Sequence, residues 1–372
     1  MKSVYIHIPF CSNICTYCDF CKIIYNEKMV NDYLVMLDKE IKFNYDKEKI
    51  KTLYIGGGTP SSLNILQLKK LFKIIKNFNF NNDIEFTFEC NIENVTEEKL
   101  KFLKENKVNR LSIGVETFND KYLKLLGRNH TKEDVNEKMK YINKYFDNIN
   151  IDLMYAFENQ TLKELDDDIK EVLSLNPKHI SLYSLIIEPH TKLYLEKFKN
   201  VNEEIDSEMF YNIKKVLEKK EYKHYEISNF SKDGYESKHN LTYWNNLEYY
   251  GFGAGASGYI DSVRYDNTRS AFNYLKGITK ISEEKQTEIE KLENEFILAF
   301  RKIDGINKEN FKEKYKIDIK EIYTVKKLIK ENKLLENQEN IYINPKYLYV
   351  MNEILIEFLE MKEGIINDKD NK

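Results

Sequence analysis

Residues 4–21 read VYIHIPFCSNICTYCDFC, and this stretch decides the fold. Residues 4–8 have the apolar pattern of a buried strand, and a loop containing Cys11, Cys15 and Cys18 follows directly. In parallel α/β barrels, the loops that follow the strands bind the ligand. Three thiolates at this spacing suit an iron–sulfur cluster, whose irons take one cysteine each. With three protein ligands on a four-iron cluster, one iron stays open to coordinate a cofactor or substrate.

The other two cysteines are interpreted differently. Cys21 follows Cys18 by three residues, and we interpret it as a free thiol beside the cluster, although it could close the cluster as a fourth ligand. Cys90 is expected to be a small core residue. The alternative to a cluster is a structural zinc site, but such sites usually combine separated Cys-x-x-Cys pairs, which this sequence lacks. In a reducing compartment, a tight group of cysteines indicates metal ligation rather than disulfide bonds.

The chain has 372 residues, 42% of them hydrophobic and 32% charged, which is enough for two or three domains with apolar cores. A net charge of -3 provides no basic field, so nucleic acid and membrane surfaces are disfavoured as primary partners. No run approaches the roughly 20 apolar residues of a membrane span, and the N-terminus lacks the features of a signal peptide. We therefore expect a cytoplasmic protein.

Apolar runs alternate with amphipathic helical stretches through the first half of the chain, a pattern typical of βα units around a parallel sheet. Six strands are predicted, at residues 4–8, 52–55, 84–89, 110–115, 150–155 and 179–186. Helices are predicted between them, at residues 30–44, 65–77, 96–106, 132–145 and 162–173. The predicted fold class is α/β, an incomplete (βα)6 barrel, and a closed eight-fold barrel is the alternative.

Four segments are expected along the chain. Residues 1–200 form the partial barrel, and residues 201–278 an irregular, aromatic- and glycine-rich extension packed against it. Residues 279–361 form a C-terminal winged-helix-like domain, with a long charged helix at 283–300, a strand pair around 334–343 and a last helix at 347–358. DNA binding by this domain is disfavoured because acidic residues match basic ones. Residues 362–372 are a polar tail.

A glycine run follows the second predicted strand, with Gly57, Gly58 and Thr59 at its end. Without a Cβ atom, backbone groups can approach a ligand closely, and a tight turn is the alternative interpretation. Carboxylates also lie in or after strands, because Glu89 ends the third, Glu116 follows the fourth, and Asp152 lies in the fifth. Buried carboxylates are costly unless they are hydrogen bonded, so these residues are expected to bind a partner, and ion pairs of Arg128 and Asp152 at the rim are the alternative.

The segment from Tyr5 to Phe20 resembles the signature of radical S-adenosylmethionine (SAM) proteins. More narrowly, it is similar to the branch that contains oxygen-independent coproporphyrinogen III oxidase and the haem chaperones. The resemblance implies a 4Fe–4S cluster on Cys11, Cys15 and Cys18, with homolytic cleavage of SAM as its chemistry. It implies that SAM is contacted by Tyr5, Tyr17, Gly57, Gly58, Thr59, Glu89, Glu116, Arg128 and Asp152. Two departures stand out: the family usually has Gln at Glu116, and Gly-Leu-Pro-Gly where residues 156–159 read AFEN.

Downstream motifs favour the chaperone side of this branch. His239-Asn240-Leu241-Thr242-Tyr243-Trp244 resembles a His-Asn-x-x-Tyr-Trp element that holds the only tryptophan. Imidazole and flat rings suit a porphyrin, so His239 is expected to ligate haem or lie beside it, a hydrogen-bonded core histidine being the alternative. His190 and Cys21 are the next candidates. Ser257 stands where the family normally has a second histidine.

Two functions are therefore carried forward. The first is a haem chaperone that binds a 4Fe–4S cluster, SAM and haem, and passes haem to acceptor apoproteins. The second is an oxygen-independent coproporphyrinogen III oxidase, which removes two propionate carboxyls. We favour the chaperone because only ten residues precede Cys11, whereas the oxidase branch carries a longer extension, and we assign no catalytic residue. A low-potential electron donor is the further expected partner, and peripheral membrane contact through haem acceptors is left open.

Overall fold

The computed structural model describes residues 1–359, and a parallel sheet lies at its centre. Six strands pair in parallel in chain order, which confirms all six predicted strands, with β4 and β5 longer than predicted. They are β1 (Lys2–Ile8), β4 (Lys49–Gly57), β5 (Asn79–Asn91), β6 (Arg110–Glu116), β7 (Ile149–Tyr155) and β8 (His179–Ser184). The mixed α/β fold with a large parallel sheet is therefore as predicted.

Helices connect these strands, as parallel pairing requires. They are α1 (Glu27–Asn44), α2 (Ile65–Ile75), α3 (Glu97–Glu105), α4 (Asp120–Leu126), α5 (Lys132–Tyr145) and α6 (Leu162–Ser174). Local sequence explains where they begin: the side chains of Thr131 and Thr161 accept hydrogen bonds from the backbone N–H of Asp134 and Glu164, and each pair forms a capping box. The short α4 was not predicted, because seven residues show too little periodicity.

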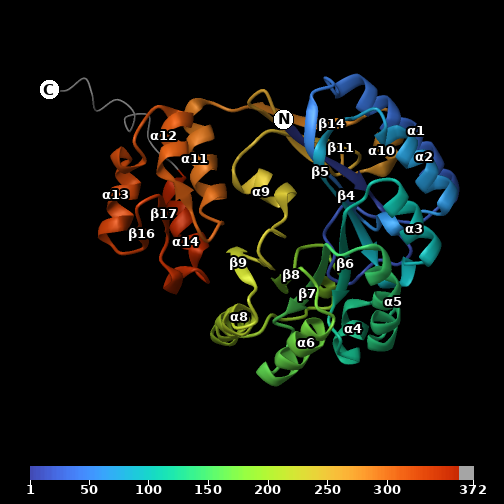
Figure 1. The fold of residues 1–372 in the computed structure, drawn as a ribbon, viewed down its shortest axis with the longest axis horizontal. Coiled ribbons are helices and arrows are strands. Elements are labelled where there is room, and N and C mark those ends of the chain that lie inside the picture. Colours follow the sequence, from blue (N-terminus) through green and yellow to red (C-terminus); the bar gives the residue numbers. More distant parts are fainter. Residues whose placement is uncertain (360–372) are drawn as a thin grey trace.

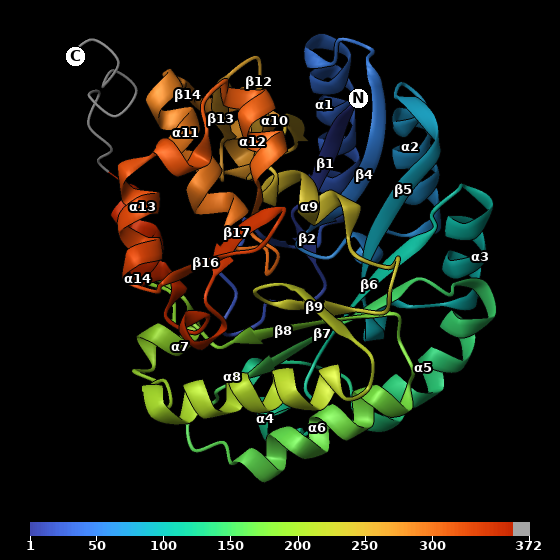
Figure 2. The same cartoon turned by 60° about the vertical axis from the view of Figure 1, so that its left-hand side comes forward.

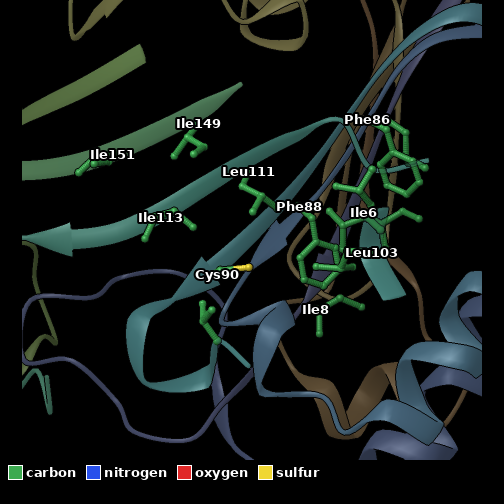
Figure 3. Packing of buried hydrophobic residues seen from close by; sticks show 14 of the residues in the cluster. Ile6, Ile8, Phe86, Phe88, Cys90, Leu103, Leu111, Ile113, Ile149 and Ile151 are labelled. Atoms are coloured by element: carbon green, nitrogen blue, oxygen red, sulfur yellow. The ribbon is translucent and has the colours of Figure 1, made fainter. Parts of the chain in front are cut away.

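One face of the sheet forms the main apolar core. Ile6 and Ile8 of β1, Phe88 of β5 and Ile113 of β6 are fully buried, and they pack with residues of the helices such as Leu103 of α3 (Figure 3). Burial of this kind contributes about 25 cal/mol per Å² of apolar surface. Alternate side chains of the same strands point to the opposite face, which is polar and carries the candidate site.

The parallel sheet continues at both edges into residues 201–285. On one side β11 (Tyr249–Phe252) pairs in parallel with β1 and is followed by antiparallel β12 (Ser257–Ile260), β13 (Val263–Asn267) and β14 (Lys280–Lys285). On the other side lie β10 (Asn229–Ser231) and β9 (Lys223–Glu226). Among the described residues the two outermost strands, β14 and β9, do not pair with each other, so the sheet is open and not a closed eight-fold barrel.

Two expectations for this region are wrong. Residues 201–278 are not irregular: they contain the long helix α8 (Glu203–Glu218), as well as α9 (Lys238–Trp244) and α10 (Ala271–Leu275). The charged stretch 283–300 is not one helix, because residues up to Lys285 belong to β14 and α11 (Glu288–Ala299) begins only after Thr287, whose side chain caps it. Residues 280–285 form a strand because they pair with β13, although every residue of β14 is exposed.

The C-terminal part forms a second apolar cluster of its own. It comprises α11, α12 (Lys308–Tyr315), α13 (Tyr323–Lys330), α14 (Met351–Leu355) and a small sheet of β15 (Ile306–Asn307), β17 (Asn340–Ile343) and β16 (Leu334–Glu336). In Figures 1 and 2 this orange-to-red group lies beside α9 and β9. Backbone hydrogen bonds join Ile227 to Arg301 and Ile303 to Tyr225, so this group covers the β9 edge of the sheet.

No helix among residues 1–359 combines the length and apolar character needed to cross a membrane. The predicted polar tail, residues 362–372, lies outside the described residues.

Candidate functional site

The face of the sheet opposite the helices carries polar side chains at adjacent positions of several strands. Tyr5 of β1 lies beside Tyr54 of β4, and Glu89 of β5 lies beside Ser112 of β6. Ser112 Oγ donates a hydrogen bond to Asp152 Oδ2 of β7 at 3.1 Å. Because these strands are parallel, their carboxyl ends meet at one edge, and this edge is the candidate site.

The cysteine loop leaves this edge directly after β1. Cys11 is in the short strand β2 (Phe10–Cys11), which pairs with β3 (Ile23–Ile24) and so closes the base of the loop. The backbone N–H of Cys18 donates to the carbonyl of Cys15 at 3.4 Å, which forms a turn between the last two cysteines. Thr16, between them, donates its backbone N–H to Leu126 and its hydroxyl to Leu125, so the loop is anchored to the end of α4.

The thiols lie close enough to influence one another. Burial raises the pKa of Cys11 to about 11, a hydrogen bond from Thr59 opposes this shift, and the neighbouring Cys18 and Cys15 add to it. Burial likewise raises the pKa of Cys18. None of the five cysteines is in a disulfide bond. Because iron binds thiolates, metal loading of this loop must release protons, which makes it pH-dependent.

The thiol donors suit an iron–sulfur cluster, because thiolates are the ligands that its irons take. Within residues 1–359, no group of three or more His, Cys, Asp or Glu side chains is arranged to hold one metal ion. Cluster ligation by Cys11, Cys15 and Cys18 stays a prediction, with a structural zinc site as its alternative.

Cys21 is turned toward the extension. Its Sγ donates to the backbone carbonyl of Arg269 at 3.0 Å, and it is only 8% exposed. A Cβ atom on Gly255 would lie 2.3 Å from the Cβ of Cys21, so this glycine is needed for the contact. As folded, Cys21 joins the loop to the segment after β13, and its exclusion from the cluster stays a prediction.

At each glycine of the run that ends β4, a side chain would collide with a neighbouring group. A Cβ atom on Gly56 would lie 2.7 Å from Glu89 Oε1, and one on Gly58 would lie 2.9 Å from Cys11 Sγ. Gly57 has a φ of +116°, and a Cβ atom there would lie 2.7 Å from the ring of His7. The run is thus more than a tight turn, because it brings a carboxylate, an imidazole and a thiol against one backbone segment.

Glu89 is held by this glycine run and by a tyrosine. Its Oε2 accepts from the backbone N–H of Gly57 at 3.0 Å, and its Oε1 accepts from the hydroxyl of Tyr54 at 2.7 Å. Burial raises the pKa of Glu89 to about 7, although both hydrogen bonds oppose the shift. A carboxyl group with this pKa can accept or donate a hydrogen bond near neutral pH.

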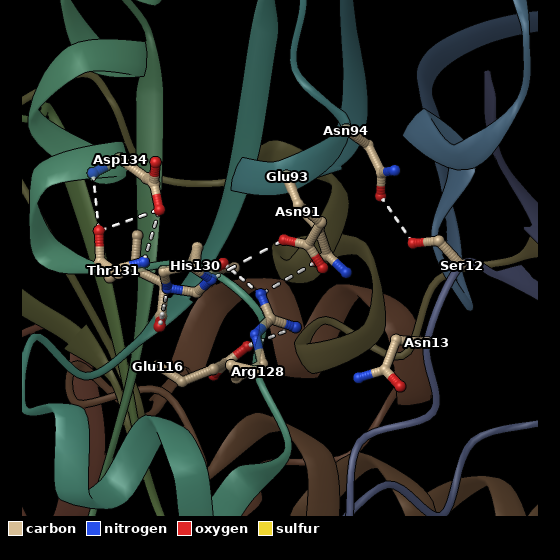
Figure 4. Close-up of polar contacts among 12 residues, drawn as sticks. Ser12, Asn13, Asn91, Glu93, Asn94, Glu116, Arg128, His130, Thr131 and Asp134 are labelled. Carbon is tan, nitrogen blue, oxygen red and sulfur yellow. Dashed lines mark hydrogen bonds and ion pairs between the residues drawn. The ribbon is translucent and has the colours of Figure 1, made fainter.

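Arg128 lies at the centre of a buried polar group that Figure 4 shows. Its guanidinium donates to the backbone carbonyl of Gly114, to Asn91 Oδ1 at 3.3 Å and to Cys15 Sγ at 3.5 Å. Glu116 Oε1 lies 3.9 Å from its Nη1. Burial raises the pKa of Glu116 to about 7, although Arg128 opposes this. The alternative interpretation named Asp152 as an ion-pair residue with Arg128, but in the structure Arg128 pairs with Glu116, and Asp152 is hydrogen bonded to Ser112 and Asn150.

Three members of this group were missed from sequence. Asn91 lies two residues after Glu89 on the same strand, so alternation would have placed it on the polar face. It also donates to Thr59 Oγ1 at 3.1 Å, linking the glycine run to Arg128. Glu93 Oε2 and His130 Nδ1 lie 3.8 Å apart, and no local sequence pattern predicts this contact.

Tyr5 and Tyr17, which were predicted to contact SAM, have different neighbours in the structure. Tyr5 OH is 3.0 Å from Nδ1 of His7. Tyr17 of the cysteine loop packs against a small apolar cluster at the same edge, which includes Leu126, Phe157 and Leu193. A hydrogen bond from Tyr17 stabilises the charged form of Glu116.

Asp168 of α6 stabilises the backbone turn that follows Glu116. Glu116 has a φ of +70°, a left-handed conformation that a side chain other than glycine rarely adopts. The buried carboxylate of Asp168 accepts from Thr117 Oγ1 at 2.6 Å and from the backbone N–H of Phe118 at 2.9 Å. These two hydrogen bonds hold the turn that follows Glu116, and Asp168 was also missed from sequence.

His239 lies deep in the structure, away from solvent. Its Nδ1 is 2.7 Å from Thr52 Oγ1 and its Nε2 is 2.8 Å from the hydroxyl of Tyr243. The side chain of Glu85 accepts from its backbone N–H at 2.8 Å, and His239 is 1% exposed. Burial lowers its pKa to about 3. In this conformation His239 has the geometry of the hydrogen-bonded core histidine, and both of its ring nitrogens are engaged.

Known proteins resemble this chain over nearly its whole length. The model of the radical SAM superfamily matches residues 5–172, which include the cysteine loop, the glycine run and Asp152. The chain is 39% identical to the haem chaperone HemW of Lactococcus lactis, covering 96% of this chain and 97% of that protein. It is 41% identical to the haem chaperone HemW of Bacillus subtilis, covering 96% and 99%.

Among solved structures, coproporphyrinogen III oxidase (HemN) of Escherichia coli, a radical SAM enzyme, has a TM-score of 0.83 at 21% identity. It covers 96% of this chain and 89% of its own, and at this identity it shows the fold alone. Identity near 40% to two relatives across almost the full chain, together with the superfamily match over the parallel sheet, shows that the chain belongs to the HemW family of radical SAM proteins.

Proposed function

We propose that this protein binds haem and a 4Fe–4S cluster in the cytoplasm and delivers haem to acceptor apoproteins. The observation that carries this proposal is the length of the alignment with relatives named haem chaperones. Two of them align with 96% of the chain, so the likeness includes the extension and the C-terminal part. The second hypothesis, the oxidase, has only the fold likeness behind it.

The residues at the carboxyl edge of the sheet support binding of the two radical SAM cofactors. Cys11, Cys15 and Cys18 would hold the cluster, and the guanidinium of Arg128, 3.5 Å from Cys15 Sγ, would offset part of its negative charge. When bound, the cluster and SAM supply one-electron cleavage of a carbon–sulfur bond. The backbone groups of the Gly57–Thr59 segment would lie against the polar part of SAM.

The carboxyl groups of this edge would bind the remaining parts of SAM. Glu89, Glu116 and Asp152 are buried within the polar face and accept hydrogen bonds from neighbouring side chains or backbone. Their hydroxyl- and amine-binding capacity is what a ribose and an amino acid require. The departures at Glu116 and at residues 156–159 bear on SAM affinity, because Glu116 and Ala156 both have positive φ values in turns at this edge.

The C-terminal part would act as a winged-helix-like module that closes the open side of the sheet. Its Ile303 donates a backbone N–H to Tyr225 of β9, and the guanidinium of Arg301 lies 5.8 Å from the centre of the Trp244 ring. The His-Asn-x-x-Tyr-Trp element therefore lies between the sheet and this module. A haem acceptor that moved the module would also move this element.

One experiment separates the two functions. Anaerobically reconstituted and reduced protein is titrated with haem and, in parallel, incubated with SAM and coproporphyrinogen III. A chaperone binds haem, transfers it to an apoprotein such as an apocytochrome, and forms no protoporphyrinogen IX. Stoichiometric protoporphyrinogen IX would reject the chaperone proposal, and absence of both activities would reject both.

A further inference from the structure

The structure distinguishes one of the six histidines from the others. His7, His130, His179, His224 and His239 are all at most 4% exposed. Haem iron needs an imidazole whose ring nitrogen is free to donate its lone pair. A buried histidine could serve only after its surroundings opened.

Hydrogen bonds give a second reason to exclude buried histidines as haem ligands. Both ring nitrogens of His7, His179 and His239 lie within hydrogen-bond distance of a partner. His130 Nε2 lies 3.1 Å from a backbone carbonyl, and His224 is stacked on Phe230 with ring centres 4.3 Å apart. Ligation through an engaged ring nitrogen would cost about 1–3 kcal/mol for each buried partner left unsatisfied. Within residues 1–359, Nδ1 of His130 and Nδ1 of His224 have no hydrogen-bond partner, and burial alone separates these two nitrogens from a ligand.

His190, in contrast, is exposed, and the segment that follows it contacts the cysteine loop. It follows β8 in the loop before α7 (Lys192–Leu195), and so lies at the same edge of the sheet as the cysteine loop. The two loops are joined directly, because the backbone N–H of Leu193 donates to the carbonyl of Thr16 at 3.1 Å. Leu193 and Tyr17 also belong to one apolar cluster.

The backbone at His190 is held in an uncommon conformation. Its φ is +70°, in the left-handed region where glycine is the usual residue. Holding a histidine there costs of order 1 kcal/mol or more, and such positions occur preferentially at binding sites. The side chain gains no hydrogen bond or ion pair in return among the described contacts.

The surroundings of His190 suit a flat apolar ligand with negative groups. Ile186, Tyr194 and Leu195 are 65%, 51% and 70% exposed, which is unusual for apolar side chains so close together in the chain. Lys199 is exposed in the same segment and could pair with a carboxylate, as could Lys192 if it left its exposed ion pair with Glu196 at 3.6 Å. A haem offers an apolar macrocycle, an iron that accepts a nitrogen ligand, and two propionates.

From these observations we propose that His190 is an axial ligand of haem, with the macrocycle lying on Ile186, Tyr194 and Leu195. The inference rests on the proposed haem-binding function and gives that function a site. Coordination forms one bond from a neutral imidazole nitrogen to the iron, and no electron or proton is transferred. The haem would then lie beside the cysteine loop, and His239 would remain a structural residue.

The test uses the full-length protein and the variant His190→Gly, which removes the imidazole and suits the left-handed backbone. Haemin is titrated and followed by its Soret band and by electron paramagnetic resonance, and iron-free protoporphyrin IX is titrated in parallel. We expect His190→Gly to weaken haemin binding by roughly tenfold or more and to lose the histidine-ligated spectrum, with protoporphyrin affinity unchanged. His190→Met should restore binding with a changed spectrum.

The matched control is Lys47→Gly, at an exposed residue with a φ of +67° in the loop between α1 and β4, and this variant should bind haemin as wild type does. If wild-type protein binds no haemin, the proposed function itself fails. If wild type binds but His190→Gly keeps its affinity and spectrum, only the assignment of His190 fails. An equal loss of haemin and protoporphyrin would overturn iron ligation, since the residue would then act only on the shape of the loop.

Discussion

Replacing Gly57 with alanine tests the link between the glycine run and SAM binding. The added Cβ would lie 2.7 Å from the ring of His7, at a residue whose φ is +116°. The backbone strain costs about 1–3 kcal/mol, and the overlap adds about 1–3 kcal/mol. Typical domains are stable by about 5–15 kcal/mol, so the variant should fold with a displaced loop.

The displaced loop must return to its original position when SAM binds. If about 3 kcal/mol of strain is reimposed at that step, SAM affinity falls roughly a hundredfold. Isothermal titration calorimetry on anaerobically reconstituted protein measures the affinity, and iron content and visible absorbance measure the cluster. We expect iron content near that of wild type, because Gly57 does not contact a cysteine sulfur among its nearest neighbours.

Two other glycines provide matched controls. Gly234 has a φ of +79° and no atom within 4 Å of the Cβ position, so Gly234→Ala carries backbone strain without a collision and should leave SAM binding unchanged. Gly58→Ala would collide with Cys11 Sγ and the backbone of Pro9, and should lower iron content. Unchanged SAM affinity in Gly57→Ala, at normal iron content, would refute the reasoning and leave the run as a turn.

Three further predictions concern neighbouring residues. Cys21→Ala should keep its iron while Cys15→Ala loses it, and equal losses on iron analysis would show that Cys21 is a ligand. Burial raises the pKa of Asp168 to about 6, so its favourable contribution to folding is present below about pH 4 and is lost as the pH rises through 6. Denaturant unfolding at several pH values should therefore show that the free energy of unfolding of Asp168→Asn depends less on pH than that of wild type. The variant should also bind SAM more weakly, because the turn after Glu116 is loosened. An unchanged pH dependence would contradict the buried carboxylate. His239→Ala leaves the partners of two hydrogen bonds unsatisfied. It should therefore cost roughly 2–5 kcal/mol of stability and lower the melting temperature, while haemin affinity persists. Loss of haemin binding in a stable variant would show that His239 is the ligand.

The local pattern of the sequence was sufficient for the parallel sheet. Strands such as β6 and β7 are buried on their helix side and carry an apolar residue at every second position, and that pattern does not depend on distant residues. Helix α5 was predicted with its observed ends, and in the structure a capping box of Thr131 and Asp134 fixes where it begins. The cysteine spacing and the glycine run are likewise contiguous features, which a sequence displays directly.

Distant contacts decided the rest. Whether residues 280–285 form a strand depends on pairing with β13, and whether Cys21 faces the cluster loop or the extension depends on Arg269, 248 residues away. The state of His239 depends on Thr52, 187 residues earlier, which occupies one ring nitrogen. Such contacts carry no local signature, because they are chosen by the packing of whole elements.

The sequence by itself therefore determined the parallel α/β fold and the residues that can ligate a cluster, since strand alternation and thiol spacing are local. Only the tertiary structure decided which polar groups meet. It pairs Arg128 with Glu116 and leaves Asp152 to Ser112, and it buries five histidines while exposing His190. The physical reason is that burial and hydrogen bonding depend on three-dimensional neighbours, so equal residue types acquire different roles.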